Sequence, residues 1–344
     1  MKTLLVATAA ALSLAFAGSA LAAYTPHLSI THTPLTLAGG GTTDLTVAFD
    51  QADDATAKVT IYVPQGYTGT LGASAGTQLG TIDASIIAFA ISPTQPLPLK
   101  GVITADDPAK YVANPCSPGT HEAVWLLRLQ AAGTELAVPG YVDTVTAPTE
   151  APLGKFKLQF CLPSPYIPPS AGGAMLGAKL VSATLHLSNV FALPAQNGSY
   201  GWTALTTPYT VNTGTPNPAG TVQARAFVQL PAQLSLKGKV KKKTATLSGA
   251  LRLNLAGLAG VKVSLLSGSS RTKLKAAGSA TTRAGGAFSF RKTVRKTTYF
   301  RARVTVPTRS ATCTGGVPGI PCASATANGF TAQSAIIKVT PKRR

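Results

Sequence analysis

The sequence has 344 residues, with 31 Lys and Arg against 11 Asp and Glu, so its formal net charge is +20. No carboxylate side chain follows Glu150, whereas residues 151–344 contain 26 Lys and Arg. Such a stretch holds neither a carboxylate general acid or base nor the anionic oxygens that hard cations prefer, and it should attract anions.

The first 23 residues have the pattern of an export signal. Lys2 precedes an apolar run from Leu4 to Phe16, and residues 20–22 read Ala-Leu-Ala, a small-x-small cleavage site. The run is too short and too rich in Ala for a membrane span, and no later stretch of the sequence is long enough for one. We expect a cleaved signal peptide (1–23), no transmembrane segment in the mature chain, and a secreted protein that is released or held non-covalently at the cell wall.

Charge divides the mature sequence into two parts. Residues 24–230 have a net charge of −3 and residues 231–344 have +22, so the first part is too weakly acidic to neutralise the second. We predict an N-terminal β-sandwich domain over 24–230 and a basic Ig-like β-sandwich domain with a basic C-terminal tail over 231–344. Residues 24–230 could form one large sandwich or two smaller ones.

The four cysteines predict two disulfides, because an even number in an exported chain favours bridges. Their spacing pairs Cys116 with Cys161 and Cys313 with Cys322, each pair within one charge region. A bridge from Cys116 to Cys161 spans the middle of 24–230 and favours one sandwich there. Zinc is the alternative, but no CxxC motif or nearby His accompanies these cysteines. We expect no metal site and no cofactor.

Short apolar and β-branched runs between Gly, Pro and Asn predict an all-β chain of two sandwiches. The Pro-rich stretches Ser92–Pro98 and Pro163–Pro169 should be irregular surface connections. In the second region the strand spacing is typical of an immunoglobulin-like sandwich. The strands expected there are Leu234–Val240, Ala245–Leu255, Val261–Leu266, Lys273–Ala280, Ala287–Lys292, Tyr299–Val306 and Ala335–Thr340.

One motif pattern extends over four segments of the second region, namely Leu247–Gly249, Leu258–Val263, Thr281–Phe290 and Thr298–Ala302. It resembles bacterial Ig-like and carboxypeptidase-regulatory-like domains over about residues 234–340. The resemblance implies a β-sandwich that serves exported proteins as a spacer, an adhesive module or a glycan-associated module. The sequence departs from that pattern at Arg283, where an acidic residue is common, and in an insertion over about 309–330.

Strand alternation should place apolar side chains inside the second domain and basic side chains outside it. Phe288 and Phe290 point inward, for example, which leaves Arg291 outside. We predict that this domain binds anionic cell-wall polymers or acidic glycans; the alternative is a charge that only keeps the protein dispersed. No recognition-helix or zinc-finger pattern indicates sequence-specific nucleic-acid binding. The predicted contact residues are Lys239, Lys241, Lys242, Lys243, Arg291, Arg301 and Arg303.

Residues 72–76 match G-x-S-x-G, which makes Ser74 a candidate nucleophile. A nucleophile elbow needs a buried strand before the serine and a helix after it, and the flanking sequence predicts neither. We therefore expect no catalytic residue and a non-enzymatic, cell-envelope-associated protein. Two alternatives stay open: a structural spacer or adhesin with its binding face in 24–230, and a serine hydrolase that uses Ser74.

Overall fold

The computed structural model of the chain describes residues 24–131, 133–230, 232–253 and 256–341. The expected signal peptide and the last three basic residues lie outside the described residues. The fold is all-β, as predicted. Disulfides join Cys116 to Cys161 and Cys313 to Cys322, as predicted. Within the described ranges, no helix is long and apolar enough to cross a membrane.

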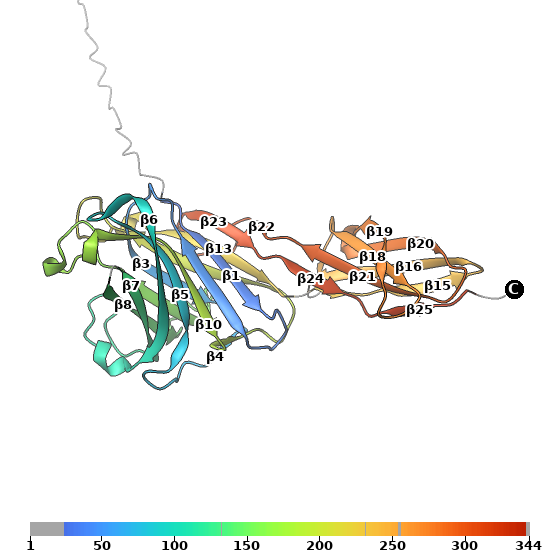
Figure 1. Cartoon of the computed structure of the whole chain (residues 1–344), viewed down its shortest axis with the longest axis horizontal. Coiled ribbons are helices and arrows are strands. Elements are labelled where there is room, and N and C mark those ends of the chain that lie inside the picture. Colours follow the sequence, from blue (N-terminus) through green and yellow to red (C-terminus); the bar gives the residue numbers. More distant parts are fainter. Residues whose placement is uncertain (1–23, 132, 231, 254–255, 342–344) are drawn as a thin grey trace, which may run out of the picture.

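A 13-stranded sheet forms the first of two units (Figure 1). The strand order is β1-β2-β10-β5-β6-β7-β8-β9-β3-β12-β13-β23-β22, and β4 (Thr68–Gly69) and β11 (Phe191–Ala192) make a small separate sheet. The bounds are β1 His27–Thr33, β2 Thr42–Ala48, β3 Thr56–Val63, β5 Gln78–Ala88, β6 Ser92–Asp106, β7 Ala123–Ala131, β8 Thr134–Thr144, β9 Phe156–Cys161, β10 Ala178–Ser188, β12 Ser199–Pro208, β13 Val222–Gln229, β22 Arg309–Ser310 and β23 Cys322–Ala327.

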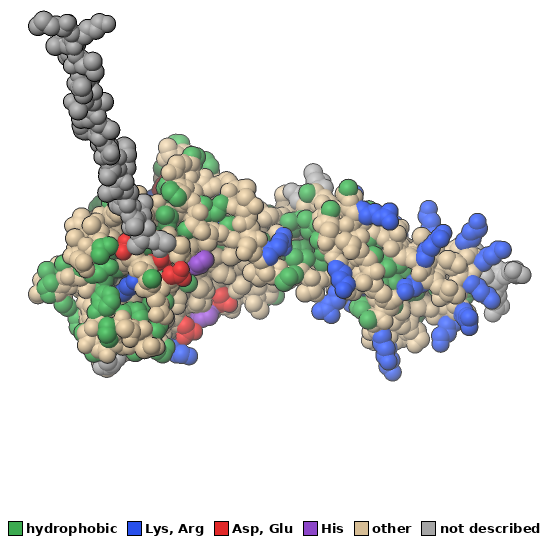
Figure 2. Space-filling view, turned by 90° about the horizontal axis from the view of Figure 1, so that it is seen from above, with side chains coloured by type: hydrophobic (Ala, Val, Ile, Leu, Met, Phe, Trp, Pro, Cys, Tyr) green, Lys and Arg blue, Asp and Glu red, His purple; other side chains and the backbone are tan. Residues whose placement is uncertain are grey.

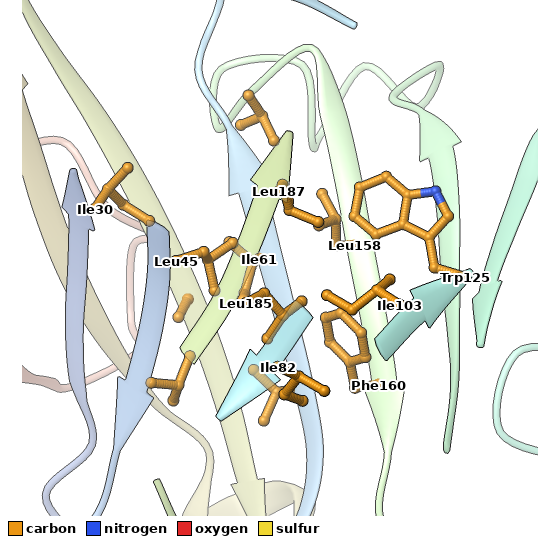
Figure 3. Close-up of a cluster of buried hydrophobic side chains, with 14 of the residues drawn as sticks. Ile30, Leu45, Ile61, Ile82, Ile103, Trp125, Leu158, Phe160, Leu185 and Leu187 are labelled. Atoms are coloured by element: carbon orange, nitrogen blue, oxygen red, sulfur yellow. The ribbon is translucent and has the colours of Figure 1, made fainter. Parts of the chain in front are cut away.

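This sheet curls until strands from its two ends lie together. Ser324 Oγ donates a hydrogen bond to the carbonyl oxygen of Pro26 at 2.7 Å, and Thr326 Oγ1 donates one to that of Leu28 at 2.9 Å. Alternate side chains of strands all around the curl therefore meet in one hydrophobic core. Figure 3 shows part of it, with Ile61, Ile82, Ile103, Leu185, Trp125 and Phe160 directed into the same space.

The first Pro-rich stretch is part of strand β6, so our expectation of an irregular connection at Ser92–Pro98 was wrong. This part of β6 pairs with β5 alone, because β7 pairs with β6 only from Lys100 onward. Proline lacks an N–H donor and is tolerated where one side of a strand needs no partner. The second stretch, 163–169, is irregular until the short helix η2 begins at Pro169.

Two five-stranded sheets packed face to face form the second unit. Their inward residues, among them Leu247, Val263, Phe290 and Phe300, are buried, in line with the predicted alternation. One sheet contains β14 (Gln233–Leu234), β15 (Lys237–Lys241), β16 (Thr244–Leu253), β17 (Ala256–Gly257) and β20 (Ala287–Thr293). The other contains β18 (Lys262–Gly268), β19 (Lys275–Thr281), β21 (Thr298–Val306), β24 (Phe330–Gln333) and β25 (Ile337–Val339). The short 3₁₀ helices are η1 (Pro108–Tyr111), η2 (Pro169–Ala171), η3 (Met175–Gly177), η4 (Pro218–Gly220) and η5 (Ala284–Gly286).

The expected insertion at about 309–330 leaves the second unit and joins the first. Strand β23 pairs in parallel with β13, and β22 pairs with β23, where we had placed both in the second domain. Figure 1 shows these two strands, in red, running over the first unit. The pairing covers the edge of β13, which would otherwise present unpaired backbone groups. A cut between residues 230 and 231 therefore does not separate the two units.

Candidate anion-binding surface

The predicted contact residues Lys239 and Arg291 come together across three strands of the second unit. In the antiparallel register, Lys239 of β15 lies opposite Thr246 of β16, which in turn lies opposite Arg291 of β20. Neighbouring strands are about 5 Å apart, and directly opposed side chains share a face of the sheet. The three exposed side chains therefore form one row on the outside of this sheet.

Two further rows flank this one. Successive positions on one face of a strand are about 7 Å apart, so the cations along β15 follow one another at that interval. The hydroxyl groups between them can donate or accept hydrogen bonds with the oxygens of an anionic polymer. All nine side chains are exposed, and we call this surface the cationic face. Its rows are Lys239–Thr246–Arg291, Lys237–Ser248–Ser289 and Lys241–Thr244–Thr293.

Lys242 and Lys243 form the two-residue turn between β15 and β16. Both are exposed, and the Lys243 carbonyl accepts a hydrogen bond from the Val294 N–H at 2.7 Å, which fixes the turn against the end of β20. Lys242 has a φ of +57°, in the left-handed region that lysine rarely adopts. The turn thus adds two cations at the end of the cationic face, one of them at a conformational cost.

Arg301 and Arg303 lie elsewhere, on β21 of the other sheet. Because the two sheets pack through their inner faces, this outer face points away from the cationic face. Arg301 Nη1 also donates a hydrogen bond to Gln333 Oε1 at 2.8 Å, which occupies part of its guanidinium. The seven predicted contact residues therefore lie on two opposite faces of the second unit. Five of them are on the cationic face or in the turn at its end, and the other two are on the outer face of the other sheet.

Charge in the two units is segregated. Figure 2 shows Lys and Arg spread over the second unit and Asp and Glu confined to the first. In the described part of the chain, each ion pair joins two residues of the first unit, as Lys110 with Asp106 at 2.7 Å and Lys157 with Glu150 at 3.1 Å. The cations of the second unit therefore have no acidic side chain that neutralises them.

The other candidates from the sequence lie apart from this surface. Ser74 is exposed in a turn that leads into strand β5 rather than into a helix. His186 lies between two carboxylates, with Nδ1 at 2.7 Å from Asp44 and Nε2 at 3.2 Å from Asp83. Its pKa is raised above the ordinary value, first by the hydrogen bond to Asp44.

Sequence reasoning missed the hydroxyl side chains of the cationic face, and it left Lys237 out of the contact set. Alternation along β15 already places Lys237 on the same face as Lys239. The partners in β16 and β20 were not evident, because only the strand register brings Ser248 and Ser289 beside Lys237. These hydroxyl residues can therefore be found only from the tertiary structure and not from the local sequence.

Comparison with known proteins names no family. No family model matches the chain, and no curated protein matches it. The crystal structure of a β-1,2-glucanase from Parabacteroides distasonis is similar at 11% identity and a TM-score of 0.19, over 93% of this chain and 36% of that one. Dimeric latent PorU from Porphyromonas gingivalis is similar at 10% identity and a TM-score of 0.18, over 90% and 34%. The chain spans about a third of the length of both, and likenesses this low carry no argument about fold or activity.

Proposed function

We propose that this is a secreted, non-catalytic protein of the cell envelope whose second unit binds anionic surface polymers through the cationic face. The observation that carries the proposal is the row Lys239–Thr246–Arg291, flanked by two more rows with exposed cations and hydroxyls. The sequence supplies no carboxylate side chain anywhere in the second unit to compete for these cations.

Charge distribution favours binding over simple dispersal. A surface that serves only to keep a protein dispersed normally mixes both signs, and this one has a single sign. The open outer face of this sheet also lets a linear polymer lie along β15 and meet Lys237, Lys239 and Lys241 in succession. Such attraction is screened beyond about 8 Å at physiological salt, so binding should weaken steeply as salt rises.

The proposal that the protein is exported to the cell envelope rests on two features. The N-terminal sequence has an export pattern, and disulfides are retained in oxidising compartments outside the cytoplasm. The resemblance of residues 234–340 to bacterial Ig-like modules supports the same assignment, since those modules belong to exported proteins. Retention at the envelope would then be non-covalent and electrostatic.

The test is retention of the full chain on immobilised linear polyphosphate, with a neutral dextran matrix as control. We expect binding in low salt, elution by about 0.5 M NaCl and no binding to dextran. Retention on polyphosphate that salt does not change, or equal retention on dextran, would contradict the proposal.

A spacer or adhesin that binds through residues 24–230 is the competing function. Deleting residues 231–344 is a poor test, because the deletion removes β23 from the sheet of the first unit. The full chain with Lys237, Lys239, Lys241 and Arg291 all changed to Gln keeps that strand. If this variant stays on isolated cell envelopes as firmly as the wild type, the first unit is the binder.

A further inference from the structure

A cavity of about 290 Å³ lies at one end of the first unit, inside the curl of the sheet. Its wall is mostly aliphatic and includes Ile86, Leu99, Leu129, Leu136, Leu162 and Leu180. Some of the lining is buried, as at Leu99, and some is exposed, as at Met175 and Ala137, so the cavity reaches the protein surface. This volume is near the lower end of the range found for ligand-binding pockets.

A second, smaller cavity of about 70 Å³ continues toward the core. All of its lining side chains are apolar, and Ala84, Leu129 and Leu180 are among those that line both spaces. At its inner side are Phe160 and Leu185, which Figure 3 shows pointing into the sheet interior. The two cavities share part of their wall and so adjoin, the larger at the surface and the smaller toward the core. Side chains around such cavities lack packing partners on one side, and an alkyl chain would supply them.

The mouth of the larger cavity has an apolar rim. Met175 of η3 lines the cavity and is 44% exposed, and Phe89 and Ile91 in the β5–β6 connection are 41% and 55% exposed. That connection is held against η3, because the Phe89 N–H donates a hydrogen bond to the Gly177 carbonyl at 3.3 Å. Single exposed hydrophobic residues are ordinary, but a group of large ones beside an apolar cavity indicates a contact site.

One buried cation lies at the same place. Lys179 lines the larger cavity and is only 7% exposed. Its ammonium donates hydrogen bonds to the backbone carbonyls of Gln51 and Asp53. An ammonium has three N–H donors, and these two bonds use two of them. Burial lowers the pKa of Lys179, whereas the charges of the nearby carboxylates Asp53 and Asp54 favour its protonated form. A third carboxylate in this region, Glu135, is paired with Arg128 at 3.1 Å.

The mouth and the cationic face are at opposite ends of the molecule. Thr56, which lines the cavity, begins β3 and pairs with Pro208 at the end of β12. The chain leaves for the second unit after Gln229, which pairs with Ser199 at the other end of β12. A ligand in the cavity therefore leaves the cationic face accessible.

We propose that the first unit binds a long-chain fatty acid, with its alkyl chain in the two cavities and its carboxylate at Lys179. The adjoining apolar cavities accept an unbranched chain, the rim receives the chain as it leaves a lipid phase, and the positive charge of Lys179 attracts an anionic head group. The same alkyl chain could come from a phospholipid, which the competition experiment distinguishes.

The experiment titrates the full chain with a fluorescent long-chain fatty acid and then adds competitors. Saturable binding, displacement by hexadecanoic acid, weaker displacement by hexadecanol and no displacement by butyric acid would support the proposal. Displacement by a single-chain phospholipid at lower concentration than by hexadecanoic acid would assign the cavity to phospholipid and overturn the fatty-acid assignment. Absence of saturable binding would overturn the site altogether.

Two matched variants locate the site. Ala137→Trp places a large ring at the exposed edge of the mouth, and Ala109→Trp places the same ring at an exposed position on η1. Circular dichroism would check that both fold. We expect Ala137→Trp to weaken fatty-acid binding about tenfold or more and Ala109→Trp to leave it unchanged. Equal affinity in the folded Ala137→Trp protein would contradict the proposal.

Discussion

Lys239 and Arg291 occupy one row of an antiparallel sheet, with Thr246 between them as the common neighbour. The three residues come from β15, β16 and β20, so no single strand carries the row. Its cations have no acidic partner in the second unit, because the sequence places every carboxylate side chain in the first.

Replacing Lys242 by Gly should stabilise the second unit. A lysine with a φ of +57° is strained by about 1 kcal/mol or more, and Gly adopts this conformation without that cost. The larger entropy of Gly in the unfolded chain offsets part of the gain, so we expect a net rise of roughly 0.5–1 kcal/mol in the free energy of unfolding. Denaturant unfolding measures it, with Lys243→Gly as the control. A loss of stability in Lys242→Gly would contradict the assigned turn.

His32 should make the protein less stable as pH falls. Its Nδ1 lies 3.0 Å from Thr43 Oγ1 and its Nε2 3.1 Å from the Tyr67 hydroxyl, and burial lowers its pKa to about 4. The neutral ring therefore contributes stability that is complete above the ordinary pKa of 6.5 and is lost as pH falls through about 4. We expect a loss of about 2–3 kcal/mol between pH 7.5 and 4.5.

The control for His32 is His32→Gln, which keeps one hydrogen bond and cannot be protonated. Its free energy of unfolding should depend less on pH over the same range. If the wild type and His32→Gln lose stability in parallel, His32 does not titrate as its environment predicts.

His186 should make the protein less stable as pH rises, which is opposite to the effect of His32. Hydrogen bonds to Asp44 and Asp83 favour its charged form, and its pKa is raised above 6.5. The stabilisation is complete below pH 6.5 and disappears as pH rises through the raised pKa. His186→Gln should therefore destabilise the protein at pH 5.5 and leave it unchanged at pH 9. Destabilisation that is largest at pH 9 would show that the ring is neutral in the folded protein.

The Cys313–Cys322 disulfide should hold β23 on the first unit. Cys322 begins β23 and lies opposite Gln223, whose side-chain amide donates to the carbonyls of Val317 and Ile320 within the disulfide loop. Changing both cysteines to Ser should cost up to about 3 kcal/mol in the chain-entropy account of a short loop. Amide hydrogen exchange should become faster in β23 and in β1, which Thr326 contacts. Unchanged exchange in β23 would mean that the pairing with β13 does not need the bridge.

Local alternation predicted which side chains of the second unit point inward, because it depends only on neighbouring residues. Phe288, Phe290 and Arg291 lie as expected for this reason. Alternation does not say which sheet a strand joins, so it could not reveal that Arg301 lies behind the cationic face. The pairing of β23 with β13 joins residues about 100 positions apart and has no local signal. The apolar cavities arise from the curl of the whole sheet, which no segment of the sequence encodes alone.

The central claim, that one sheet face binds an anionic polymer, is tested most directly by the salt dependence of polyphosphate affinity in two matched double variants. Lys239→Gln with Arg291→Gln removes two charges from the cationic face, and Arg301→Gln with Arg303→Gln removes two from the opposite face. Each phosphate contact contributes about 0.7–0.9 to the slope of log K against log salt concentration in nucleic acids, so the first variant should reduce the slope by about 1.5. The second should change it little. Equal reductions in both variants, or no reduction in the first, would contradict the account.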